Sequence, residues 1–190
     1  MDLYFTSSVS GNVADPANAL GAPDNVWTTD TGNTNWTHRW RLGSPGGNYI
    51  ATGTQTLVLR VRRDSTGGTD PTINSVTLIQ GANSTVIRST SYVPGNGDDL
   101  TITFDSSILN GLENVDIELA TSGGGGSPAN RRSVQVDGAT WQANLTLIES
   151  TMINTWNGTA WVQGSLKKYN GTTWVGVILK RWNGTAWENA

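Results

Sequence analysis

The single histidine, His38, is the side chain best suited to acid–base chemistry near neutral pH, and the 190-residue chain has no cysteine. Thiolate nucleophiles and thiolate metal sites are therefore excluded, and one histidine cannot form a metal cluster. No Gly-x-Ser-x-Gly segment is present to hold a serine nucleophile on a strained turn. We interpret His38 as a structural or surface residue, expect no catalytic residue, and predict that the protein is not an enzyme. A hydrolase with paired carboxylates is a minor alternative, because the separation of two carboxylates is a three-dimensional property.

Oxygen-bearing side chains gather in one threonine-rich stretch, at Asp24, Asn25, Asp30 and Asn33. Calcium prefers such hard oxygen ligands, but the spacing does not match an EF-hand loop. We interpret the stretch as an Asx-rich loop and expect no cofactor, with a structural Ca²⁺ as the alternative. Other aspartates are interpreted mainly as turn formers, namely Asp64, Asp70, Asp98, Asp99 and Asp137.

The C-terminal residues form an internal repeat of three consecutive 13-residue units, 152–164, 165–177 and 178–190. Each unit contains aromatic-Asn-Gly-Thr-(Ala/Thr)-Trp. Exposed aromatic rings can stack on sugars and are frequent in interface hot spots, although here they can also form a small core between hairpins. The residues we expect to bind a partner or a glycan are Trp156, Trp161, Tyr169, Trp174, Arg181, Trp182 and Trp187.

Asn-Gly between strand-forming residues predicts a β-hairpin in each unit. A two-residue loop at 157–158 would place Trp156 opposite Thr159, with Trp161 as a diagonal neighbour on the same face. The three glycines of these turns, Gly158, Gly171 and Gly184, should have positive φ. If the units stack linearly, the central pair Tyr169 and Trp174 should be the most buried, and the terminal pair Trp182 and Trp187 should reach a partner.

Residues 1–150 consist of short alternating apolar runs separated by turn-rich segments, such as the four consecutive glycines after Ser122. About eight such runs predict an antiparallel, jelly-roll-like β-sandwich with little helix. We therefore predict two parts: a β-sandwich domain over 1–150, which carries His38 and the Asx-rich loop, and three hairpin repeats over 151–190, which carry the aromatic residues. Charge divides similarly, since residues 1–151 hold 8 basic and 14 acidic residues, and residues 152–190 hold 4 and 1.

The composition also indicates what kind of β-protein this is and which partners are unfavourable. Only 14% of the residues are charged, and threonine, asparagine and glycine supply much of the polarity, which is typical of extracellular β-proteins. The segment MDLYFTSSVSGN lacks the basic and apolar regions of a signal peptide, so we expect synthesis without export, as for a virus particle. A net charge of −3 disfavours nucleic-acid binding, and no apolar run is long enough for a membrane span.

The repeat resembles the Trp-rich C-terminal hairpin repeats of tailed-bacteriophage virion proteins of the minor-tail and capsid-decoration type. The residues that carry this resemblance are 156–161, 169–174 and 180–187. A second, shorter segment, 18–24 followed by Trp27-Thr28, resembles the early part of galactose-binding-like sandwiches. That family binds sugars or Ca²⁺ at loop ends, but no binding residue can be carried over from so short a segment.

The resemblance implies a non-enzymatic structural protein of a phage virion, acting in particle attachment, stabilisation or surface adhesion. Its expected partners are other capsid or tail proteins and a host-surface glycan, and it would be made in the host cytoplasm. We expect the hairpin repeats to anchor the protein and the sandwich to be displayed, with the reverse arrangement, in which the hairpins are displayed as an adhesin, as the alternative. The sequence is also compatible with a homo-oligomer. The alternative is a carbohydrate-binding module of a secreted or surface protein.

Overall fold

The computed structural model describes the chain apart from residues 30–34, 47–48, 66–68, 124–131, 148–151, 157–158, 160, 166, 177–179, 183, 186 and 190. For residues 65, 132, 152–156, 161–165, 180–182 and 187–189 it describes the backbone alone. The chain forms two compact units, Met1–Thr146 and Leu147–Ala190. This division falls a few residues before the boundary predicted at 150.

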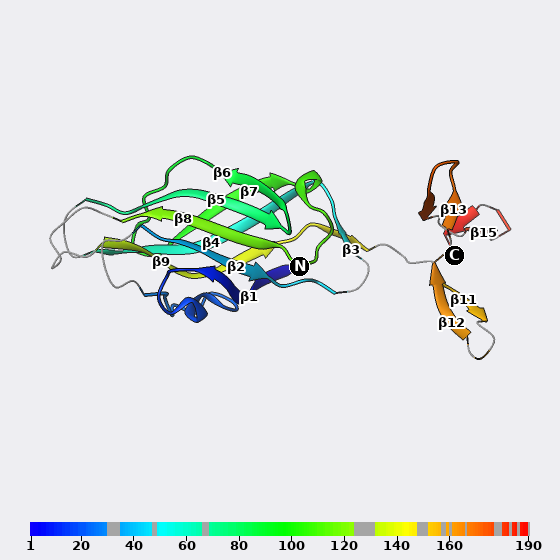
Figure 1. Cartoon of the computed structure of the whole chain (residues 1–190), viewed down its shortest axis with the longest axis horizontal. Coiled ribbons are helices and arrows are strands. Elements are labelled where there is room, and N and C mark those ends of the chain that lie inside the picture. The colour runs from blue at the N-terminus through cyan, green and yellow to red at the C-terminus, as the bar shows by residue number, and fades with distance from the viewer. Residues whose placement is uncertain are drawn as a thin grey trace. The chain divides into compact units, whose positions relative to one another are not determined.

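Eight antiparallel strands form one sheet in the first unit, in the order β6-β5-β8-β2-β1-β9-β4-β7 (Figure 1). These strands are β1 (Asp2–Gly11), β2 (Thr37–Leu42), β4 (Thr54–Ser65), β5 (Thr72–Gln80), β6 (Asn83–Arg88), β7 (Asp98–Asp105), β8 (Asp116–Ser122) and β9 (Arg132–Gln142). The short strands β3 (Tyr49–Ala51) and β10 (Leu145–Leu147) pair with each other. In the part of the chain that the structure describes, helix is limited to the 3₁₀ turns η1 (Pro16–Ala19) and η2 (Ser106–Ile108), and no helix there could cross a membrane. The prediction of an all-β antiparallel fold with little helix is confirmed.

Strand β1 joins the two halves of this sheet. Its first residues, Asp2–Tyr4, pair with β9, whereas Phe5–Gly11 pair with β2. Register shifts after Phe5 and after Ser8 mark bulges, which bend a strand and increase its twist. The sheet curls until its edge strands β6 and β7 are in contact, so it is nearly closed.

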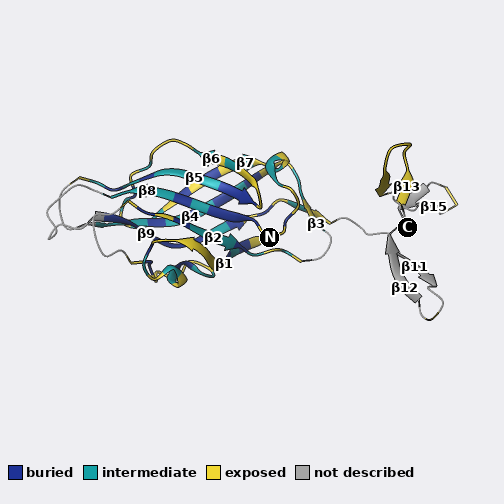
Figure 2. Cartoon of the chain, viewed as in Figure 1, coloured by how far each residue is buried: buried dark blue, intermediate teal, exposed yellow. Residues whose placement is uncertain are grey.

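The hydrophobic core lies inside the curled sheet, where alternate residues of each strand face inward (Figure 2). In β4, Leu57 and Leu59 are fully buried, while Val58 and Arg60, on either side of Leu59, are half-buried and face outward. Trp40 and Trp141 are also fully buried, and the Trp40 ring stacks on Phe5 with centroids 5.4 Å apart. An aromatic side chain removes about 150–250 Å² from water, worth roughly 4–6 kcal/mol before entropy is subtracted.

Apolar and polar residues alternate over 141–147 as in a single strand, but this segment divides into the end of β9 and the whole of β10. Gln55, buried on β4, explains the break. Its Nε2 donates to the Asn144 carbonyl at 3.2 Å, and the Asn144 N–H donates to Gln55 Oε1 at 3.1 Å. Asn144 is thus bound by a side chain at the point where the strand ends.

Most of the aspartates predicted in turns lie in strands instead: Asp64 in β4, Asp98 and Asp99 in β7, and Asp137 in β9. Hydrogen bonds to the carboxylates explain why several of these strands accept them. Asp98 accepts from the Tyr92 hydroxyl at 2.8 Å, and Asp99 accepts from Arg60 Nη1 at 3.1 Å. Asp137 accepts from two backbone amides.

The second unit contains three hairpins, each a separate two-stranded sheet. Their strands are β11 (Met152–Trp156) with β12 (Trp161–Ser165), β13 (Lys167–Tyr169) with β14 (Trp174–Gly176), and β15 (Lys180–Trp182) with β16 (Trp187–Asn189). The aromatic residues of each unit are direct cross-strand partners: Trp156 with Trp161, Tyr169 with Trp174, and Trp182 with Trp187.

The predicted two-residue loop is therefore wrong, since the loop of the second hairpin comprises residues 170–173. The asparagine side chain is the physical reason. Asn170 Oδ1 accepts from the backbone amides of Thr172 at 3.0 Å and Thr173 at 2.9 Å, which closes a wider, Asx-type turn. Positive φ is confirmed at Gly171 (100°) and Gly184 (102°), while Gly158 lies outside the described residues.

Candidate functional site

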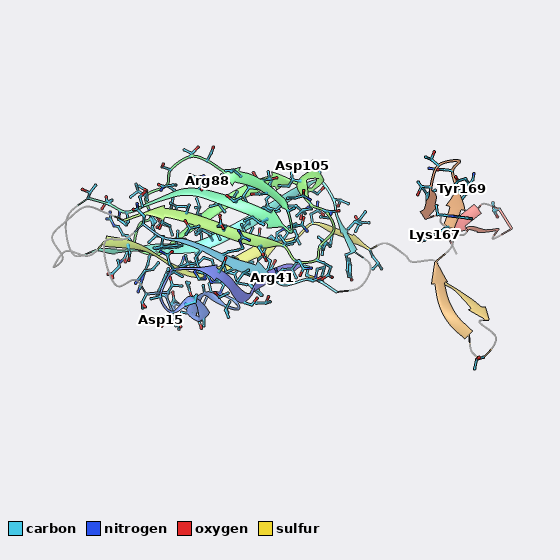
Figure 3. The ribbon with its side chains drawn as sticks, in the orientation of Figure 1. Asp15, Arg41, Arg88, Asp105, Lys167 and Tyr169 are labelled. Carbon is cyan, nitrogen blue, oxygen red and sulfur yellow. The ribbon has the colours of Figure 1, made fainter. Side chains whose placement is uncertain are left out.

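The second hairpin presents an exposed aromatic pair. The Tyr169 and Trp174 rings have centroids 5.5 Å apart with an interplanar angle of 54°, and these residues are 52% and 65% exposed. Because side chains alternate along a strand, Lys167 lies on the same face as the two rings. Lys168 and its partner Val175 lie on the opposite face. Figure 3 labels Lys167 and Tyr169 on this hairpin. One face thus combines two adjacent, tilted rings with an exposed ammonium group.

The Tyr169 and Trp174 rings, predicted to be the most buried of the three aromatic pairs if the units stack linearly, both face solvent. Because the burial of the other two pairs lies outside the described residues, the order of burial stays a prediction. The side chains of the other predicted binding residues, Trp156, Trp161, Arg181, Trp182 and Trp187, lie outside the described part of the chain. Their backbones are placed, and Arg181 pairs across its hairpin with Glu188. The structure therefore brings the predicted residues together two by two, one aromatic pair in each hairpin.

His38 is buried, at 2% exposure, against the Trp40 ring, with centroids 4.3 Å apart. Its Nε2 lies 2.8 Å from Ser8 Oγ, which is the geometry of two members of a catalytic triad. The third member is missing from the described residues, since Nδ1 has no hydrogen-bond partner there and lies against the backbone of Gly11. Burial lowers the pKa of His38, so the ring is neutral around pH 7. Without an acceptor at Nδ1 among the described residues, the ring is not held in the tautomer that a general base needs.

The calcium alternative has little support in the described residues. Asp24 Oδ1 accepts from the Val26 amide at 2.9 Å, which is a local Asx turn. Asp30 and Asn33 lie outside the described residues, and the described part of the chain contains no group of three or more His, Cys, Asp or Glu side chains placed to hold a metal ion.

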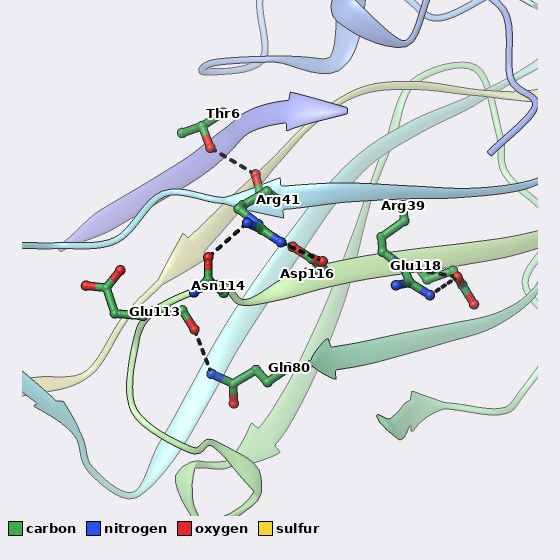
Figure 4. Close-up of polar contacts among 8 residues, drawn as sticks. All are labelled: Thr6, Arg39, Arg41, Gln80, Glu113, Asn114, Asp116 and Glu118. Atoms are coloured by element: carbon green, nitrogen blue, oxygen red, sulfur yellow. Dashed lines mark hydrogen bonds and ion pairs between the residues drawn. The ribbon is translucent and has the colours of Figure 1, made fainter. Parts of the chain in front are cut away.

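Two ion pairs cross the outer face of β2 and β8 (Figure 4). Arg39 donates to Glu118 Oε2 at 2.9 Å, and Arg41 binds both carboxylate oxygens of Asp116 at 2.7 and 3.1 Å. Arg41 also donates to Asn114 Oδ1 at 2.9 Å, and the hydrogen bond to Asp116 raises the pKa of Arg41. Arg39 and Arg41 line a hollow of about 620 Å³, but each guanidinium group is already paired with a carboxylate, so neither offers an uncompensated positive charge to a ligand.

Sequence reasoning missed Asp137. It was interpreted as a turn residue, yet it lies in β9, is 1% exposed, and holds the backbone of residues 24–25 through its carboxylate. The residue order offers one signal, since Asp137-Gly138 interrupts the apolar alternation of Val134 and Val136. Such an interruption is as typical of a bulge as of a turn.

By its architecture the chain is an all-β antiparallel protein with appended hairpins. No family model matches it, and no curated protein matches it significantly. Functional inference therefore rests on the surfaces described above.

Proposed function

We propose that the protein is a non-enzymatic accessory protein of a tailed-phage particle, of the capsid-decoration or minor-tail type. The observation that carries the proposal is the second hairpin, where Tyr169 and Trp174 are both exposed beside Lys167. Adjacent exposed aromatic rings are costly in water and are frequent in protein interfaces. The Trp-rich repeat resembles repeats of tailed-phage virion proteins, which supports a capsid or tail protein as the partner.

Within this proposal, the hairpin unit anchors the protein to the particle and the first unit is displayed. Residues 152–190 are basic, whereas residues 1–151 are acidic. The basic hairpin unit would be steered toward an acidic surface on the particle, while its aromatic rings supply apolar contact. The reverse arrangement, in which the first unit is anchored and the hairpins bind a host-surface glycan, is the other form of the same proposal.

We also propose to group the first unit with jelly-roll-like β-sandwiches. Its support is the core enclosed between the two halves of the sheet, which are joined by the bent strand β1. Strands that pass from one half to the other through a bulge are a common way to form the corner of a sandwich.

The second candidate function is a carbohydrate-binding module. The observation that favours it is the shared face of Tyr169 and Trp174, since aromatic faces stack on the C–H faces of sugar rings. Specific sugar binding without any association with particles would favour this candidate.

Co-sedimentation with purified tailed-phage particles tests the proposal. The full chain should sediment with the particles, and a chain ending at Ser150 should remain in the supernatant. Equal sedimentation of both would show that the hairpins are not the anchor. No sedimentation of the full chain with the particles would contradict the virion role.

A further inference from the structure

A hollow of about 380 Å³ opens on the outer face of β4, β7 and β9, in the size range of small-molecule sites. Its floor is formed by Val58 and Arg60 of β4 and by Thr140 and Gln142 of β9. These residues alternate with buried ones, so their side chains point away from the core. Asp99 of β7 forms one rim and pairs with Arg60 Nη1 at 3.1 Å.

A β-bulge builds the opposite wall. Gly138 pairs with Arg60 and Val136 with the next residue of β4, which leaves Asp137 without a cross-strand partner. Bulges re-aim side chains and are frequent beside functional sites. Here the Asp137 carboxylate accepts from the backbone amides of Asp24 and Asn25, each at 3.0 Å. The loop that carries Asn25 is therefore fixed against the sheet before any ligand arrives.

Gly138 lets this loop approach closely. A Cβ at this position would lie 3.4 Å from the Gly21 carbonyl oxygen and 3.5 Å from Pro23 Cγ. Pro23 and Asn25 both line the hollow as a result. A wall held by buried hydrogen bonds lowers the ordering cost of binding.

The lining selects the chemistry of the ligand. Asn25, Gln142 and Thr140 can each donate and accept hydrogen bonds, as a sugar hydroxyl does. The charges of Arg60 and Asp99 offset each other, and the Asp137 carboxylate is occupied by the loop amides. An anion would meet Asp99 and Asp137 without a free cation to compensate. A neutral ligand with many hydroxyls fits this lining best.

We propose that this hollow binds a saccharide ring. Asn25, Thr140 and Gln142 bind its hydroxyls, Asp99 and Arg60 bind a further hydroxyl from the rim, and Val58 contacts a C–H face. Asp137 is a positioning residue that holds the loop. The site lies wholly in the first unit and does not depend on the hairpins or on the virion role.

Protein-observed NMR of the full chain tests the site. The probes are the methyl glycosides of glucose, galactose, mannose, rhamnose and N-acetylglucosamine, each titrated to millimolar concentration. At least one should shift the side-chain amide signals of Asn25 and Gln142. The double variant Thr140→Val/Gln142→Ala should weaken that binding about tenfold or more, since two hydrogen bonds are lost. Thr85→Val on β6, a matched half-buried threonine, should leave the affinity unchanged.

The outcomes separate this site from the hairpins. Binding that survives Trp174→Ala but weakens in the double variant supports the hollow. Absence of shifts with every glycoside, or binding unchanged in the double variant, overturns the proposal. Binding lost in Trp174→Ala and kept in the double variant also overturns it, and assigns the sugar to the hairpin, while the virion role still depends on co-sedimentation alone.

Discussion

Single residues in strands hold the loops that shape the surface of the first unit, and Asp137 is the clearest example. It is buried and accepts backbone hydrogen bonds from a loop more than a hundred positions earlier in the sequence. Sequence alone could not find this role, because a carboxylate flanked by glycine is equally typical of an exposed turn. The bulge in β9 points the Asp137 carboxylate at the amides of Asp24 and Asn25, and the sequence pattern does not show this contact.

Asp137→Ala should lower the free energy of unfolding by roughly 1–3 kcal/mol, because two backbone amides lose a charged acceptor. Urea denaturation measures this loss. Asp99→Ala is the matched control, since its ion pair with Arg60 is partly exposed and such pairs contribute about 0–1 kcal/mol. Equal losses in both variants would mean that Asp137 does not hold the loop.

Tyr92 and Asp98 give the first unit a pH dependence. Burial, with the hydrogen bond to Asp98 second, raises the pKa of Tyr92 to about 12. The hydrogen bonds from the Tyr92 hydroxyl and the Gly95 amide lower the pKa of Asp98. A lowered carboxyl pKa adds stability that is present above the unfolded-state pKa and is lost as pH falls through the folded-state pKa.

Tyr92→Phe should therefore cost most stability near neutral pH and progressively less in acid, below the ordinary aspartate pKa of about 3.9. Unfolding by urea, compared near pH 7 and near pH 3, measures the difference between variant and parent. A difference that is constant across this range would show that the hydrogen bond does not stabilise the ionised form of Asp98.

At the scale of elements, the alternating runs predicted the strands well, because one face of each strand must be buried. For example, the apolar-rich segment Leu57-Val58-Leu59-Arg60-Val61 lies in β4, and Val76-Thr77-Leu78-Ile79 lies in β5. The predicted strand and turn boundaries were wrong where a side chain, instead of a neighbouring strand, forms hydrogen bonds with the backbone. Gln55 binds Asn144 in the break between β9 and β10, and Asn170 widens the hairpin turn. Neither effect follows from hydrophobic periodicity.

Gly171→Val should destabilise the second hairpin by about 1–2 kcal/mol, because a β-branched residue is penalised at a φ of 100°. Gly176→Val is the matched control on the same hairpin. Neither position has an atom within 4 Å of an added Cβ, and only Gly171 has positive φ. The Tyr169 and Trp174 side-chain NMR shifts report on the hairpin, and equal changes in both variants would rule out backbone strain as the cause.

At the scale of the whole molecule, the buried apolar cluster lies within the first unit, among the residues whose burial the structure describes. A chain ending at Ser150 should therefore unfold cooperatively at nearly the same temperature as the full chain. Calorimetry of the two chains checks this. A large fall in the unfolding temperature of the shorter chain would mean that the hairpins stabilise the first unit.

We propose that the hairpins attach the protein to a phage particle. Electron microscopy of gold-labelled protein, on tailed-phage particles recovered from host cells that make it, tests this claim most directly. We expect gold at a regular place on the capsid or tail for the full chain, and its loss in Tyr169→Ala/Trp174→Ala when soluble protein is equally abundant. Particles without gold in the presence of folded, labelled full chain would contradict the claim.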